Sequence, residues 1–137
     1  MSLPIPYGAV IYAKDHRVLA KFYEHVAGLT QREGNEEYIL LNAPSFQLVV
    51  LQIPDRLAAN ITIDKPPRKR ESTPIKLFLN VSSIEKARQA AKLMGGELNS
   101  VEKEWTFHGI KRRDGIDPEG NVFQVQEVPA RTESTSG

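Results

Sequence analysis

The chain has 137 residues, no cysteine, a formal net charge of +1 and a hydrophobic fraction of 40%. This length suits a single domain with its own packed core, and the lack of cysteine excludes disulfides and thiolate metal sites. The near-zero charge gives no reason to expect nucleic acid or an anionic membrane as partner, and no apolar run approaches the ~20 residues of a membrane span.

The first half of the chain predicts a strand, a helix and three more strands. Val10, Ile11 and Tyr12 favour the first strand because they are β-branched or aromatic. Asp15 can cap a helix whose apolar residues recur at three- and four-residue spacing, and Gly28 can end that helix in a left-handed conformation. Turn residues then separate three expected strands, at 29–33, 38–41 and 47–53.

The second half of the chain repeats this order. Residues 75–81 predict a strand, Ser82 or Ser83 can cap the next helix, and Gly95-Gly96 can end it. The capping position and the terminating glycine are as far apart as in the first half. Three strands are again expected, at 98–101, 105–111 and 122–128, the last after a strong turn pattern at 117–121. The duplication predicts two tandem βαβββ modules.

We expect a single domain over residues 1–137, with module 1 at about 5–53 and module 2 at about 75–128. The connection, residues 54–74, contains a proline pair and a basic cluster between Lys65 and Arg70. A connection of this length is usually functional or mobile. Two interpretations follow: a solvated linker between the modules, or a loop that crosses to the other module and partly covers a pocket.

The two chain ends predict a cytoplasmic protein with a disordered tail. The N-terminus lacks a charged region followed by an apolar one, which is the pattern of a signal peptide. Residues 129–137 are mostly small and polar, a composition typical of disorder. We therefore expect a cytoplasmic location and no membrane insertion.

The order and spacing of these patterns resemble the vicinal oxygen chelate superfamily, which includes glyoxalase I, bleomycin resistance proteins and extradiol dioxygenases. The resemblance covers roughly residues 5–128 and rests on four segments: Lys14-Asp15, Phe22-Tyr23 followed by Ala27-Gly28-Leu29, Gly95-Gly96, and residues 117–124. It implies an α+β fold in which the two modules form a cupped, mostly antiparallel eight-stranded sheet with the helices outside. It also implies a homodimer, since such cups commonly pair.

Enzymes that this chain resembles hold a divalent metal in the cup, with His, Gln or Glu ligands on the first and last strands of each module. The corresponding positions here fall on Gly8, Val49, Lys76 and Gln124, with Gln47 as the alternative to Val49. Glycine and valine have no donor atom, and a protonated lysine has no free lone pair. A divalent metal site requires several histidine or carboxylate ligands. We therefore expect no metal and no other cofactor.

Strand alternation sorts the side chains into two sets. The set that faces the cup contains the candidate ligand-binding residues Tyr12, Val49, Lys76, Phe78 and Gln124, to which the region of Trp105 and Arg112 is added. The opposite set is expected to pack under the helices: Ile11, Leu77, Leu79, Phe123 and Val125. An apolar and aromatic cup with few polar points is typical of a small-molecule pocket. Alternatively, these side chains simply fill the cup.

Aromatic rings in the cup can stack on a planar ligand, and Lys76 beside Gln124 can hold a carboxylate or phenolate. The adjacent Arg112 and Arg113 allow two interpretations. One of them forms an ion pair with a nearby aspartate, or one reaches the mouth of the cavity as a second anion contact.

The three histidines are weak catalytic candidates. His16 and His25 are expected on opposite sides of one helix, at its surface or covering it. His108 lies on the expected strand at 105–111 and can reach the cup, where histidine suits general acid–base chemistry. A surface or packed role is the alternative for His108.

Three functions are compatible with these residues. The first is a metal-free protein that binds a small aromatic or anionic molecule in the cup. The second is a lyase- or dioxygenase-type enzyme of the same superfamily, with a displaced metal or with acid–base chemistry by Lys76, His108 or Tyr12. The third is an interaction module that uses the segment from Lys65 to Arg70. We favour the first, with a small-molecule ligand and a second copy of the chain as partners.

Overall fold

The fold is taken from a computed structural model, which describes residues 4–129. Module 1 contains β1 (Gly8–Ala13), α1 (His16–Ala27), β2 (Thr30–Gly34), β3 (Tyr38–Ala43) and β4 (Phe46–Gln52). Module 2 contains β5 (Leu77–Val81), α3 (Ile84–Leu93), β6 (Glu97–Leu98), a 3₁₀ turn (Val101–Lys103), β7 (Trp105–Phe107), β8 (Ile110–Ile116) and β9 (Val122–Glu127). The short α2 (Asp55–Ala58) follows module 1. The expected disordered tail lies outside the described residues, apart from Pro129.

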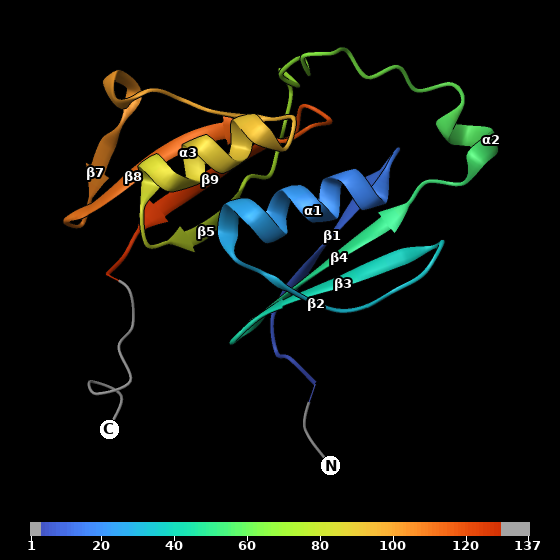
Figure 1. The fold of residues 1–137 in the computed structure, drawn as a ribbon, viewed down its shortest axis with the longest axis horizontal. Helices are drawn as coiled ribbons and strands as arrows, with labels where there is room; N and C mark the ends of the chain where they lie inside the picture. The colour runs from blue at the N-terminus through green and yellow to red at the C-terminus, as the bar shows by residue number, and fades with distance from the viewer. Residues whose placement is uncertain (1–3, 130–137) are drawn as a thin grey trace.

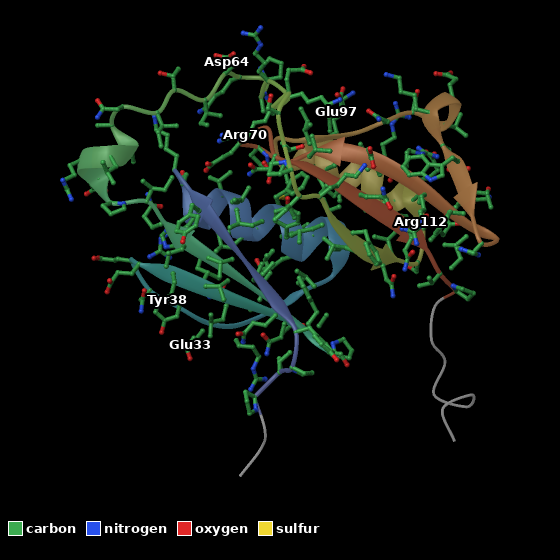
Figure 2. The ribbon with its side chains drawn as sticks, turned by 180° about the vertical axis from the view of Figure 1, so that it is seen from behind. Glu33, Tyr38, Asp64, Arg70, Glu97 and Arg112 are labelled. Atoms are coloured by element: carbon green, nitrogen blue, oxygen red, sulfur yellow. The ribbon has the colours of Figure 1, made fainter. Side chains whose placement is uncertain are left out.

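The strands form two sheets, in the order β1-β4-β3-β2 and β5-β9-β8-β6, and β7 also pairs with β8. In each module the first and last strands pair in parallel, and the other pairs are antiparallel. Figure 1 shows α1 and α3 in front of the strands, and Figure 2, seen from behind, shows the strands in front of the helices, so both helices cover the same side of the sheets. The predicted α+β class, built from two modules with the helices outside, is confirmed.

The sheets differ in detail from the expectation of eight strands in one cup. Among the described residues, four strands form one sheet and five form the other, and the two sheets are not joined. The additional strand arises because the expected strand at 105–111 is interrupted by His108 and Gly109, whose φ angles are 51° and 76°. Positive φ at both central residues is the geometry of a two-residue type I′ hairpin turn.

The core lies between the helices and the faces of the sheets that the helices cover. The two helices pack on one another and bury one apolar face each, with Leu19, Phe22, Tyr23 and Val26 on α1 and Ile84, Ala87 and Ala91 on α3. The rings of Phe22, Tyr23 and Phe123 meet edge to face, with centroids 5.2 to 5.7 Å apart. Because Phe123 belongs to β9, the two modules share this core.

Local sequence determines where both helices begin. The Asp15 side chain accepts a hydrogen bond from the backbone N–H of Val18 at 3.3 Å, which caps α1 as predicted. Of the two serines proposed to cap α3, Ser83 does so, accepting from the N–H of Lys86 at 3.2 Å. Gly28 ends α1 with a φ of 68°, the left-handed conformation that glycine adopts without strain.

Glu119 of module 2 is built into the start of α1 in module 1. It is buried, and its two carboxylate oxygens accept hydrogen bonds from the backbone N–H groups of Lys14 and Asp15, each at 2.8 Å. A carboxylate at this position is favoured by the partial positive charge of a helix N-terminus. The turn between β8 and β9 therefore joins the two modules.

A buried tyrosine–aspartate pair lies where the turn between β8 and β9 meets α1. We call this contact between the modules the joint. The Tyr23 hydroxyl donates to Asp117 Oδ2 at 2.7 Å, and both side chains are almost completely buried. Burial is the main cause that raises the pKa of Asp117 above its ordinary value, although the hydrogen bonds from Tyr23 and Asn121 oppose that rise. Burial also raises the pKa of Tyr23, so the phenol stays protonated.

The connection between the modules touches module 2. The backbone N–H of Arg70 donates to the carbonyl of Gly120 at 3.0 Å, and Arg70 Nε donates to the carbonyl of Glu119 at 3.3 Å. A side chain at Gly120, whose φ is 85°, would overlap with the carbonyl oxygen of Arg68. The end of the connection therefore packs on the turn between β8 and β9, which both interpretations of the segment allow.

Candidate functional site

Backbone pairing identifies the equivalent positions of the two modules. Val49 lies opposite Val10 in the first sheet, just as Gln124 lies opposite Phe78 in the second. The helices also begin alike, since a side chain at the end of β4 or β9 accepts a hydrogen bond from the first helical N–H. These matches support the alignment that places a metal position on Val49 rather than on Gln47.

The residues at the four metal positions do not fit a divalent ion. Gly8 has no donor, and a Cβ added there would lie 2.5 Å from the carbonyl oxygen of Gln47, so the position has no room for a ligating side chain. Val49 has no donor, Lys76 is a cation, and only Gln124 offers an oxygen. Within residues 4–129, no group of three or more His, Asp or Glu side chains is placed to hold a metal.

A series of three hydrogen bonds crosses the open side of the second sheet. Lys76 Nζ donates to Asp114 Oδ2 at 2.9 Å, which is also an ion pair. Gln124 Nε2 donates to Asp114 Oδ1 at 3.1 Å, and Arg112 Nη1 donates to Gln124 Oε1 at 2.7 Å. The bonds fix the orientation of the Gln124 amide, because its nitrogen faces the carboxylate and its oxygen faces the guanidinium. Two cations and one carboxylate are thus held in one row.

Aromatic rings adjoin both cations. The Cζ atom of Arg112 lies 5.0 Å from the ring centroid of Phe78 and 5.2 Å from that of Phe107, and Lys76 Nζ lies 6.0 Å from that of Trp105. These distances are within the range of cation–π attraction. Phe78 and Phe107 are 56% and 52% exposed, so ring surface remains accessible. Figure 2 shows Arg112 on this side of the strands. We call the surface the module 2 face and define it by Lys76, Phe78, Trp105, Phe107, Arg112, Asp114 and Gln124.

Two buried polar atoms at the module 2 face have no hydrogen-bond partner among the described residues. They are Nε of Arg112, a donor, and Oε1 of Gln126, an acceptor. Arg112 and Gln126 lie opposite one another in the β8–β9 ladder. Buried polar atoms are normally paired, but neither atom is exposed, so a ligand would reach them only after a side chain moves.

The remaining two predicted ligand-binding residues lie on the first sheet. Tyr12 is 66% exposed and lies in a row with Leu51 and Tyr38, and Val49 lies on the same side in the next row. This side is apolar at its centre. The structure therefore brings together five of the predicted residues, on the module 2 face, and places Tyr12 and Val49 on a different sheet.

The two adjacent arginines have separate roles because neighbouring residues in a strand point to opposite faces. Arg113 is buried under α3, where it forms ion pairs with Glu85 at 3.2 Å and Glu104 at 2.6 Å. Within the described chain, neither arginine pairs with an aspartate, so that interpretation is wrong. Arg112 lies on the open face, and its predicted role as an anion contact stays a prediction.

Two histidines differ from expectation. His108 lies in the turn after β7 instead of on a strand, with its ring centroid 4.2 Å from that of Phe107. His16 is buried instead of lying at the surface, and its ring nitrogens lie 2.9 Å from Gln52 Oε1 and 2.8 Å from the carbonyl oxygen of Asn35. The β2–β3 turn covers the start of α1, a tertiary contact that helical spacing does not reveal.

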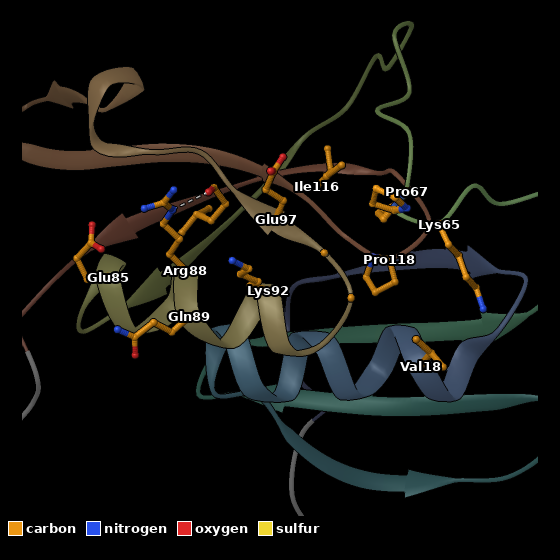
Figure 3. Close-up of a pocket in the computed structure, with 14 residues that line it drawn as sticks. Val18, Lys65, Pro67, Glu85, Arg88, Gln89, Lys92, Glu97, Ile116 and Pro118 are labelled. Carbon is orange, nitrogen blue, oxygen red and sulfur yellow. Dashed lines mark hydrogen bonds between the residues drawn. The ribbon is translucent and has the colours of Figure 1, made fainter.

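A hollow of about 910 Å³ lies on the helix side of the molecule. Its walls come from α3, β6, the turn at Pro118 and the connection at residues 65–67. Figure 3 shows Lys65 and Lys92 extending in different directions, and Glu85 is already paired with Arg113. Its charged groups do not converge on one point. The module 2 face, where they do converge, is therefore the better candidate site.

The sequence interpretation missed Phe107 and the position of Asp114 in this site. Phe107 follows Trp105 by two residues, so strand alternation alone was sufficient to place both on one face. Asp114 likewise shares the parity of Arg112. The bond from Gln124 to Asp114 depends on the register of β8 against β9, which alternation within a single strand does not determine.

The family model of the glyoxalase-like domain matches residues 8–126 of this chain. The chain belongs to this family. Among curated proteins, none matches it. The fold of this glyoxalase-like domain is similar to solved structures of low sequence identity, which support the fold alone.

Three structures illustrate the similarity. A glyoxalase/bleomycin resistance protein/dioxygenase family enzyme from Burkholderia phytofirmans PsJN is 18% identical to this chain. The superposition covers 88% of this chain and 96% of the Burkholderia chain, with a TM-score of 0.65. The fosfomycin resistance protein FosX from Listeria monocytogenes has 9% identity, covers 100% of both chains and gives 0.62. A bleomycin resistance determinant encoded on the transposon Tn5 has 13% identity, covers 88% and 94%, and gives 0.55. The predicted superfamily is confirmed.

None of the helices within residues 4–129 of this glyoxalase-like domain has the length and apolar character needed to cross a membrane.

Proposed function

We propose that this glyoxalase-like domain binds a small planar anion, an aromatic carboxylate or phenolate, on the module 2 face. The single observation that carries the proposal is the state of Arg112. Its guanidinium is oriented by Gln124, which accepts from Nη1, and its Cζ lies 5.0 and 5.2 Å from the centroids of the half-exposed rings of Phe78 and Phe107. A planar guanidinium held in this way suits a carboxylate, which can accept two parallel N–H bonds.

The aromatic surface supports a planar ligand. Phe78 and Phe107 are about half exposed, and Trp105 is partly exposed beside Lys76. Rings of this kind favour offset or edge-to-face contact with another aromatic ring, and they contribute apolar burial as well. An aromatic anion would use both the rings and the guanidinium, whereas an aliphatic anion would use only the second.

Binding in this proposal does not require the divalent metal of the superfamily. Three of the four metal positions carry no available lone pair, and Gly8 has no room for a ligating side chain. Metal analysis of protein purified without chelator tests this part. We expect less than stoichiometric Zn, Mn, Fe or Ni, and one bound ion per chain would contradict the proposal.

We also propose that the protein is a homodimer in which a second copy covers the open side of the first sheet. Val10 and Tyr12 are large apolar side chains on that side, and they are 53% and 66% exposed in the single chain. Exposed apolar surface of this kind often marks an interface. Sedimentation at micromolar concentration should give the mass of two chains, and the mass of one chain would refute this part.

An enzyme of the same superfamily is the alternative function, and fewer contacts support it. Lys76 is engaged by Asp114, His108 lies in a turn, and Tyr12 is on the other sheet. These three candidates for acid–base chemistry therefore do not meet at one point of the chain. A cytoplasmic location is also part of the proposal.

The test of the proposed function uses Trp105, which is the single tryptophan of the chain. Benzoate titrated into the protein should change the fluorescence of Trp105 in a saturable way. Arg112→Met should weaken binding at least tenfold, because it removes the guanidinium. Lys111→Met, which removes a neighbouring charge from the opposite side of β8, is the matched control and should bind as the wild type does. Equal affinities for all three proteins would reject the proposal.

A further inference from the structure

Asp114 gives the module 2 face an uneven distribution of charge. The face carries two cations, Lys76 and Arg112, and one carboxylate, Asp114, so one positive charge is in excess. The carboxylate does not lie midway between the cations. It contacts Lys76 directly at 2.9 Å and reaches Arg112 only through the amide of Gln124. Lys76 is therefore compensated and Arg112 is not.

We infer that Asp114 is the specificity-determining residue of this site and restricts its ligand to a planar monoanion. The inference rests on the proposed function. Asp114 withholds Lys76 from the ligand and leaves Arg112 as the single uncompensated cation. A monoanion meets Arg112 alone. A dianion brings a second negative charge that must displace Asp114 from Lys76 or lie beside the Asp114 carboxylate.

The geometry makes this competition effective. The side chains of Lys76 and Asp114 are 39% and 27% exposed, so the ion pair is partly shielded from water. Asp114 is also fixed from its other oxygen by Gln124 Nε2 at 3.1 Å. Because the oxygen of the same amide accepts from Arg112, displacement of Asp114 would release the amide group that positions the guanidinium.

Four proteins separate this role from a merely structural one. The wild type has one excess positive charge on the face, Asp114→Asn has two, Lys76→Met has none, and the double variant returns to one. Benzoate and isophthalate serve as monoanionic and dianionic probes at constant ionic strength, with Trp105 fluorescence and ¹H–¹⁵N NMR as readouts. The quantity compared is the ratio of the two dissociation constants within each protein, so that a general loss of affinity cancels.

The wild type should bind benzoate at least as tightly as isophthalate. Asp114→Asn should improve the relative affinity for isophthalate about fivefold, which is the upper range for a single exposed ion pair. The double variant should return to the wild-type ratio, because Lys76 is then absent. Rescue of this kind is not expected if Asp114 only supports the fold.

An unchanged ratio in Asp114→Asn, with both probes still bound, would overturn the inference and leave the proposed function intact. A double variant that keeps the ratio of Asp114→Asn would overturn it as well, since Lys76 would then have no part. If neither probe binds the wild type, the proposed function fails and the inference fails with it. The ¹H–¹⁵N spectrum of each variant reports folding independently, and Lys76→Met with the double variant keeps the comparison available if Asp114→Asn does not fold.

Discussion

Replacing Tyr23 by phenylalanine should weaken the joint between the modules in a pH-dependent way. The substitution removes one hydroxyl and keeps the ring, whose edge contacts with Phe22 and Phe123 have centroid distances of 5.2 and 5.7 Å. The bond that is lost runs from the hydroxyl to Asp117 Oδ2 at 2.7 Å in a fully buried site. Asp117 keeps its donors from Glu119 and Asn121, so it is not left without partners.

A hydrogen bond to a charged group contributes about 1.5–3 kcal/mol, and the remaining donors favour the lower half of that range. We therefore expect Tyr23→Phe to lower the free energy of unfolding by about 2 kcal/mol at pH 7. The pKa of Asp117 is raised in the folded protein, chiefly by burial. Protonation thus favours the folded state, and the stability that Asp117 contributes is present below its unfolded pKa and is lost as pH rises through the folded pKa.

The hydroxyl of Tyr23 opposes this rise, because its hydrogen bond lowers the pKa of Asp117. Without the hydroxyl the folded pKa rises further, so the cost of the substitution is greatest at neutral pH and smaller in acid. Urea denaturation at pH 7 and near pH 4 measures both values. Tyr38→Phe is the control, since it removes a hydroxyl that donates to Glu33 at the surface. A cost that is the same at both pH values, or no greater than that of Tyr38→Phe, would refute the reasoning.

Three further predictions concern the joint and the metal positions. Glu119→Gln should cost about 1 kcal/mol in urea denaturation, because it removes the charge that faces the start of α1; an effect equal to that of the exposed Glu36→Gln would contradict this. Gly120→Ala should cost at least about 1 kcal/mol. It should cost more than Gly109→Ala, where φ is also positive but the space is open, and equal costs would argue against contact with the connection. The wild-type protein should not gain thermal stability from added zinc, because its four metal positions offer only the oxygen of Gln124; a rise in melting temperature would contradict the donor-set argument.

Much of the fold follows from the sequence because its determinants are local. The caps at Asp15 and Ser83, the glycine at Gly28 and the alternation that buries Leu79 and Val125 each involve residues close together in the chain. Alternation also placed Phe78 on the open side of the second sheet. The internal repeat added the long-range order, since equivalent strands take equivalent partners in both modules.

The rest depends on contacts between distant segments. The hairpin turn at His108 needs a positive φ at a residue other than glycine, so its composition alone does not distinguish it from a strand. The burial of His16 depends on the carbonyl of Asn35, and the cap of α1 by Glu119 joins residues more than one hundred positions apart. The candidate site differs from the predicted one for the same reason. Arg112 is its central cation because Asp114, placed opposite Gln124 by the register, holds Lys76.

The central claim is that an aromatic anion binds the module 2 face without a metal. The most direct measurement is the ¹H–¹⁵N NMR spectrum of chelator-treated protein during a benzoate titration. We predict saturable shifts that cluster on β5, β7, β8 and β9 around Arg112 and Trp105, and that are unchanged when Mg²⁺ or Zn²⁺ is added afterwards. Shifts that cluster instead at the hollow beside Lys92, or that appear only after the metal is added, would contradict the account.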